Sequence, residues 1–83
     1  MQKELPESVT TLNGDLRKAL GRREFTDPAL KAFDQLCGRL TGWLVGKPND
    51  VDTSATALAS ILDSEGLGDL AARVRLIPKE LAA

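Results

Sequence analysis

Residue types that could carry catalysis are scarce in this 83-residue chain. There is no histidine, and the only cysteine is Cys37. Histidine is the usual general base and the commonest metal ligand in proteins, and a cysteine without a neighbouring histidine has no evident activator. The stretches GRREF and GKPND lack the glycine spacing of a phosphate-binding loop. We therefore expect no enzyme, no metal site and no cofactor.

The acidic residues are scattered rather than paired. Asp63 and Glu65 are close in sequence, but residues two apart on a helix point in different directions. No run has the ligand spacing of a calcium-binding loop. The carboxylates therefore predict no acid–base pair and no site for a hard cation.

The densest basic cluster is a candidate for partner binding. It consists of Arg17, Lys18, Arg22 and Arg23. One interpretation is structural, because cations near the C-terminus of a helix are stabilised by the backbone dipole. The other is a docking patch for an acidic surface or a phosphate. Arg22 and Arg23 lie beyond the expected helix end and gain less from the dipole, which leaves the docking interpretation open.

A second candidate surface lies on the segment that organises the chain. Gly38 and Gly42 are four residues apart and share one side of a helix. Such a groove admits a partner helix or is filled by helices of the same chain, and we favour the second interpretation. Trp43 would be part of the core in a monomer and part of the seam in a dimer. The seven partner-binding candidates are Arg17, Lys18, Arg22, Arg23, Gly38, Gly42 and Trp43.

The segment 27–45 has the strongest helical pattern. Its apolar residues recur at spacings of three and four, as in an amphipathic helix. Asp27 is a favourable N-cap, Pro28 suits the first helical position, and Gly46 is a natural stop. The stripe consists of Leu30, Phe33, Cys37, Leu40 and Leu44.

Three further segments have the same periodicity, and we expect helices at about 7–20, 53–65 and 68–76. Asp52 or Thr53 would cap the third helix of the chain. Pro78 would end the last at about Leu76. The sequence thus predicts an all-α fold, with residues 1–83 forming one compact bundle of about four helices.

Two features near the first helix bear on its limits. Asn13-Gly14 favours turns, so this helix begins near residue 7 or only at Asn13. Phe25, in the short connection that follows, is expected to turn inward beside the start of the central helix.

The balance of charge argues against a dedicated nucleic-acid or membrane-surface protein. The net charge is −1, and acids outnumber bases five to three from Val51 onward. A helix-turn-helix pair at 54–76 would place Asp69 towards the phosphates, which opposes the attraction that supplies non-specific affinity. The N-terminal MQKELPESV lacks the apolar segment of a signal peptide, and no apolar run is long enough for a bilayer. We expect a cytoplasmic protein.

The C-terminal half resembles the last two helices of death-fold adaptor domains. The residues that carry the resemblance are Trp43, the turn GKPND, the segment 53–62 (TSATALASIL) and the segment 66–71 (GLGDLA). The order in that family is a tryptophan-bearing helix, a turn, a helix that opens with threonine and a final G-L-x-D-x-A helix. The resemblance implies a homotypic protein-interaction module that acts through charged surface patches.

These observations favour a non-catalytic protein–protein interaction module. It would act as an adaptor, or as a small inhibitor that binds another protein, or by forming a homodimer. The alternative is a small dimeric nucleic-acid-binding regulator whose basic cluster is doubled by dimerisation.

Overall fold

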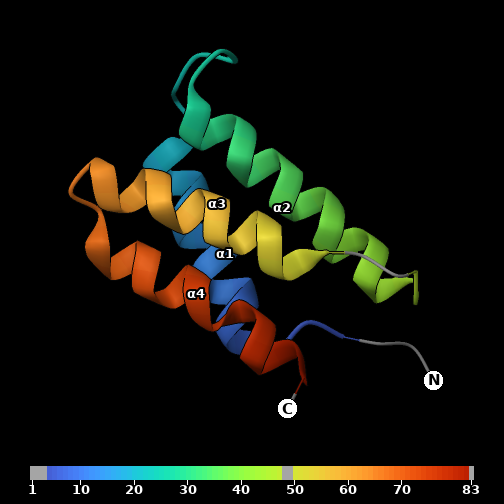
Figure 1. The fold of residues 1–83 in the computed structure, drawn as a ribbon. Coiled ribbons are helices and arrows are strands. Elements are labelled where there is room, and N and C mark those ends of the chain that lie inside the picture. Colours follow the sequence, from blue (N-terminus) through green and yellow to red (C-terminus); the bar gives the residue numbers. More distant parts are fainter. Residues whose placement is uncertain (1–3, 48–49, 83) are drawn as a thin grey trace.

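All four periodic segments form helices in the computed structural model, which describes residues 4–47 and 50–82. In chain order they are α1 (Glu7–Leu20), α2 (Pro28–Leu44), α3 (Val51–Ser64) and α4 (Gly68–Ala82) (Figure 1). No strand occurs in the described part of the chain. The prediction of an all-α bundle of four helices is confirmed.

Helix α3 lies between α2 and α4 and packs on both of them, while α1 packs on α4 and α2 behind it (Figure 1). Each helix buries one apolar face, and no polar or charged residue in the described part of the chain is buried. The fully buried large side chains are Val9, Leu12, Leu16, Leu20, Leu36, Leu58, Leu62, Val74 and Ile77. Burial of these stripes stabilises helices too short to persist alone in water.

Helix α1 has the first of its two predicted starts and the predicted end, and α2 is one residue shorter than predicted at each end. Asn13-Gly14 lies inside α1, which begins at Glu7. At the start of α2, Asp27 accepts hydrogen bonds from the backbone N–H groups of Ala29 and Leu30, at 2.9 and 3.2 Å. Gly46 has a φ of 79° just after the end of α2, the left-handed conformation that glycine adopts at helix ends.

Helix α3 begins earlier than predicted because Asp50, rather than Asp52 or Thr53, is its cap. The Asp50 carboxylate accepts hydrogen bonds from the backbone N–H of Thr53 at 2.9 Å and from its hydroxyl at 2.6 Å. Three residues with capping side chains occur within four positions, and the sequence pattern does not rank them. Asp50 fits because Val51, the first helical residue, is then buried.

The prediction that Pro78 ends α4 is wrong, since the helix continues to Ala82. A proline inside a helix removes one backbone hydrogen bond and crowds the preceding turn. Tertiary contacts offset that cost: Leu81 packs against the core beyond the proline, and the Ser8 hydroxyl of α1 donates a hydrogen bond to the Glu80 carboxylate. These contacts are between distant parts of the chain, so local sequence gives no sign of them.

Candidate functional site

The connection between α1 and α2, residues 21–27, carries the most exposed large apolar side chain in the described part of the chain. Phe25 is 89% exposed, so the expectation that it turns inward is wrong. The buried stripes stop on either side of it, at Leu20 and Ala29, both 0% exposed. A hydrophobic staple would need apolar residues at Thr26 and Lys31, and both are polar. Phe25 therefore has no local partner to bring it inward.

The backbone of this connection is nevertheless held by hydrogen bonds. The Arg23 N–H donates to the Leu20 carbonyl at 3.1 Å, and the Asp27 N–H donates to the Glu24 carbonyl at 2.9 Å. Two turns thus occupy the seven residues between the helices. Phe25 is presented by a connection of defined shape.

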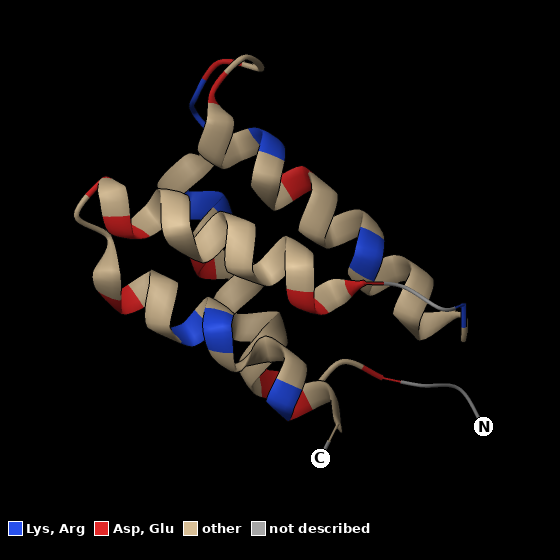
Figure 2. Ribbon diagram, viewed as in Figure 1, with Lys and Arg blue, Asp and Glu red and all other residues tan. Residues whose placement is uncertain are grey.

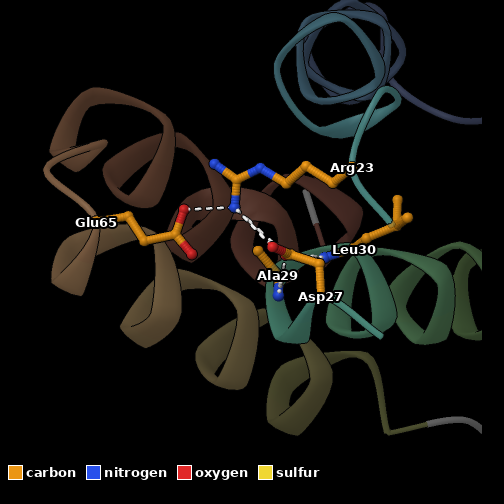
Figure 3. Close-up of polar contacts among 5 residues, drawn as sticks. All are labelled: Arg23, Asp27, Ala29, Leu30 and Glu65. Atoms are coloured by element: carbon orange, nitrogen blue, oxygen red, sulfur yellow. Dashed lines mark hydrogen bonds and ion pairs between the residues drawn. The ribbon is translucent and has the colours of Figure 1, made fainter. Parts of the chain in front are cut away.

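The side chain of Arg23 joins this connection to the end of α3 (Figure 3). Its Nη1 lies 2.5 Å from Glu65 Oε1 and 3.3 Å from Asp27 Oδ1. Figure 3 shows the guanidinium between the two carboxylates, with Ala29 and Leu30 beside Asp27. The three side chains are each 30% exposed or less, so the pairing is only partly screened by water.

The electrostatics agree with this geometry. The hydrogen bond to Glu65 is the largest contribution that raises the pKa of Arg23. For Asp27, partial desolvation is the largest contribution and would raise the pKa, but hydrogen bonds from Leu30, Arg23 and Ala29 outweigh it and lower the pKa overall. Both groups are therefore held in their charged forms at neutral pH.

The structure divides the four basic candidates into two kinds. Arg17, Lys18 and Arg22 are exposed, whereas Arg23 is half-buried in its ion pairs. Reversing the charge of Arg23 would place three acidic groups together and destabilise the fold. Charge reversal at both Arg22 and Arg23 would therefore perturb the fold as well as any binding surface, so Arg22 alone is the appropriate position for a test of binding.

The glycine pair on α2 is not covered in the way the sequence suggested. A side chain at Gly38 would meet no atom within 4 Å of its Cβ, so no other described helix fills the space above this glycine. Gly42 is half-buried. The interpretation that the chain's own helices fill this groove is therefore wrong at Gly38.

Trp43 is half-buried at the edge of the core, against which it packs. It also lines an open pocket of about 220 Å³ where the end of α2 meets the start of α3 and the end of α4. The single tryptophan thus packs against the core on one side and lines a surface pocket on the other.

Groups with potential reactivity do not converge. Within residues 4–47 and 50–82, no three His, Cys, Asp or Glu side chains are placed to hold a metal ion together. The thiol of Cys37 is half-buried, 3.6 Å from the Asn13 side-chain oxygen, and burial raises its pKa. None of the helices described is long and apolar enough to cross a membrane.

Sequence reasoning missed two residues of this site, Phe25 and Glu65. The sequence does contain a signal that Phe25 is exposed, since both positions of a hydrophobic staple, Thr26 and Lys31, are polar. Glu65 has no local signal, because its partner Arg23 is 42 residues away.

Comparisons of the chain with protein-family models, with curated proteins and with solved structures return no match. The resemblance of the C-terminal half to death-fold adaptor domains stays a prediction.

Proposed function

We propose that this chain is a non-catalytic protein–protein interaction module that docks through the α1–α2 connection. The observation that carries the proposal is the 89% exposure of Phe25 on a connection fixed by Arg23. The module would work as an adaptor, or as a small inhibitor that covers a surface of another protein, with a second copy of the chain as one such partner.

The energetics of docking favour this region over the rest of the surface. Full burial of a phenylalanine side chain contributes about 1.5–3 kcal/mol. A segment held in one conformation loses less conformational entropy when it binds. The ion pairs of Arg23 hold the α1–α2 connection in one conformation in this way. Aromatic residues and arginine dominate binding energy at protein interfaces, and exposed Arg22 lies three residues from Phe25.

Photo-crosslinking tests the proposal directly. Phe25→p-benzoyl-phenylalanine keeps an aromatic ring at the tip of the connection. Expressed in the native host cells and irradiated, this variant is expected to form a discrete adduct that mass spectrometry identifies. The same substitution at Ser60, which is exposed on α3, is the control position. Identical adducts from both positions, or none from position 25, would refute the proposal.

A charge variant then tests the surroundings of Phe25. Arg22→Glu is expected to lower the adduct yield at least about five-fold, as for a residue that contributes substantially to the binding free energy of an interface. Lys79→Glu makes the same change of charge on α4, where Lys79 is exposed, and is expected to leave the yield unchanged.

The alternative, a small dimeric nucleic-acid-binding regulator, rests on the exposed cations Arg17, Lys18 and Arg22. Figure 2 shows positive and negative residues interspersed along the helices rather than separated onto different faces. Three cations per chain would give a weak, strongly salt-dependent affinity. A mobility shift at low salt that disappears in Arg22→Glu would favour this alternative, and no shift would remove it.

A further inference from the structure

A second surface lies at the other end of α2. The pocket beside Trp43 has a volume of about 220 Å³ and is open to solvent. A cavity of about 150 Å³ is enough to admit benzene, so this one has room for a large side chain. Its wall combines one aromatic ring, two carboxylates and aliphatic groups, supplied by Trp43, Asp50, Val51, Asp52, Pro78 and Leu81.

Both carboxylates of the pocket belong to the start of α3. Asp50 caps the helix and stays charged, because the hydrogen bonds from Thr53 lower its pKa. Asp52 is exposed, and within the described part of the chain it forms no ion pair. The carboxylate of Asp50 offsets part of the positive partial charge at the N-terminus of α3. The residues that line the pocket thus carry two negative charges and no positive one, while Arg39, outside the lining, also helps to lower the pKa of Asp50.

An aromatic ring beside two carboxylates selects for a cation. A cation over an indole ring is attracted by the electrons of its face, and carboxylates would repel an anionic occupant. Arginine suits this combination better than lysine, since its planar guanidinium stacks on aromatic rings and pairs with carboxylates through two hydrogen bonds. Its methylene stem would lie against the aliphatic wall, as such stems commonly do.

The geometry points to a binding site for an arginine side chain of a partner protein, in the pocket formed by Trp43, Asp50 and Asp52. This assignment rests on the proposed function, because it gives the interaction module a second contact of stated chemistry. The pocket and the Phe25 connection lie at opposite ends of α2, whose 17 residues span about 26 Å along the helix axis. The two contacts can therefore be tested separately.

The experiment uses the indole N–H signal of Trp43, the only tryptophan, in nitrogen-15 NMR spectra of the full chain. The probe is N-acetyl-arginine amide at low ionic strength, which limits screening. The expected result is a saturable shift of the indole signal, with a Kd on the order of 1–10 mM for a single side chain. N-acetyl-citrulline amide has nearly the same shape without the charge, and is expected to bind at least about five-fold more weakly.

Two charge-removing variants locate the binding energy. Asp52→Asn is expected to raise the Kd of the arginine probe about two- to five-fold, as for the loss of an exposed ion pair. Asp50→Asn should do the same without unfolding α3, because asparagine is an equally good N-cap. Asp69→Asn, an exposed position at the far end of α4, is the matched control and should leave the Kd unchanged.

Three outcomes would overturn the assignment. They are no saturable shift at Trp43, an equal response to the citrulline probe, or an unchanged Kd in both Asp50→Asn and Asp52→Asn. An indole signal that moves with protein concentration alone would also overturn it, in favour of a second copy of the chain in the pocket. Crosslinking at Phe25 together with failure at Trp43 would refute this inference and leave the proposed function standing.

Discussion

Two connections lie side by side at one end of the bundle, and each contains one large apolar residue. In the turn between α3 and α4, Leu67 packs against the core. In the connection between α1 and α2, Phe25 is almost fully exposed. The Arg23–Glu65 ion pair joins the two connections. They therefore share an environment but differ in whether their apolar side chain is packed against the core or exposed to solvent.

The difference begins with the backbone at the helix ends. Gly66 has a φ of 79°, and the N–H groups of Gly66 and Leu67 donate to the carbonyls of Asp63 and Leu62 at 3.2 and 2.9 Å. This is a Schellman motif, which turns the next residue back onto its own helix. Gly21 has a φ of −67° instead, so the chain leaves α1 without that reversal. The connection then projects from the bundle (Figure 1).

The contrast teaches that a glycine stop has two outcomes for the apolar residue that follows. A left-handed glycine returns it to the core, where it stabilises the fold. A glycine in the helical region leaves it outside, where its contribution is available to a partner.

The largest effect expected from this comparison is at the base of the α3–α4 turn. Leu62 is 0% exposed, and Leu62→Ala is expected to lower the free energy of unfolding by about 2–5 kcal/mol. Phe25→Ala, in the other connection, is expected to change it by less than about 0.5 kcal/mol. Urea unfolding followed by circular dichroism measures both. A similar loss in the two variants would abolish the distinction between a structural and an exposed connection.

A smaller effect is expected at the glycine that creates the turn. Gly66→Ala forces a side chain into the left-handed region, at a cost of about 1–2 kcal/mol. The space around Gly66 is open, so strain in the backbone is the only source of that loss. Thermal unfolding measures it, and an unchanged melting temperature would show that the turn does not depend on the positive φ.

Gly38→Ala should act in the opposite direction. Gly38 is exposed inside α2 with nothing above it, so alanine is expected to raise the free energy of unfolding by about 1 kcal/mol. Gly14→Ala in α1 has equally open surroundings and is the control. If Gly38→Ala stabilises the chain but lowers the Phe25 adduct yield while Gly14→Ala does not, the glycine side of α2 is part of the interface.

The smallest effect concerns pH at the ion pairs that join the two connections. The pKa of Asp27 is lowered from its ordinary value of 3.8, so its stabilising contribution is complete above about pH 4 and is lost as the pH falls further. Arg23→Gln removes one cause of the lowered pKa and is expected to make the melting temperature less sensitive to acid. Melting curves from pH 7 to pH 2.5 test this, with Lys79→Gln, which removes one exposed cation from α4, as a control that leaves the Arg23 pairing in place. Equal acid sensitivity in the Arg23→Gln variant and the parent chain would contradict the role given to Arg23.

The sequence predicted the features that depend on local periodicity and punctuation. The four apolar stripes, the Asp27 cap and the stop at Gly46 follow from the spacing and type of neighbouring residues. The extension of α4 beyond Pro78 and the Arg23–Glu65 ion pair depend on contacts between distant parts of the chain. The prediction for Phe25 was wrong because an apolar residue in a short connection was expected to be buried. Neither of the nearby staple positions, Thr26 and Lys31, has an apolar side chain that could pack against it.

The ion pair between Arg23 and Glu65 has a consequence for the order of folding. Helices α3 and α4 meet through a turn between near neighbours, and such contacts form early because little loop entropy is lost. The Arg23 contact needs both halves of the chain and can close only when they have docked. The geometry that presents Phe25 is therefore incomplete until the two halves of the chain have docked, so a partner that recognises it would bind docked molecules and not earlier folding intermediates.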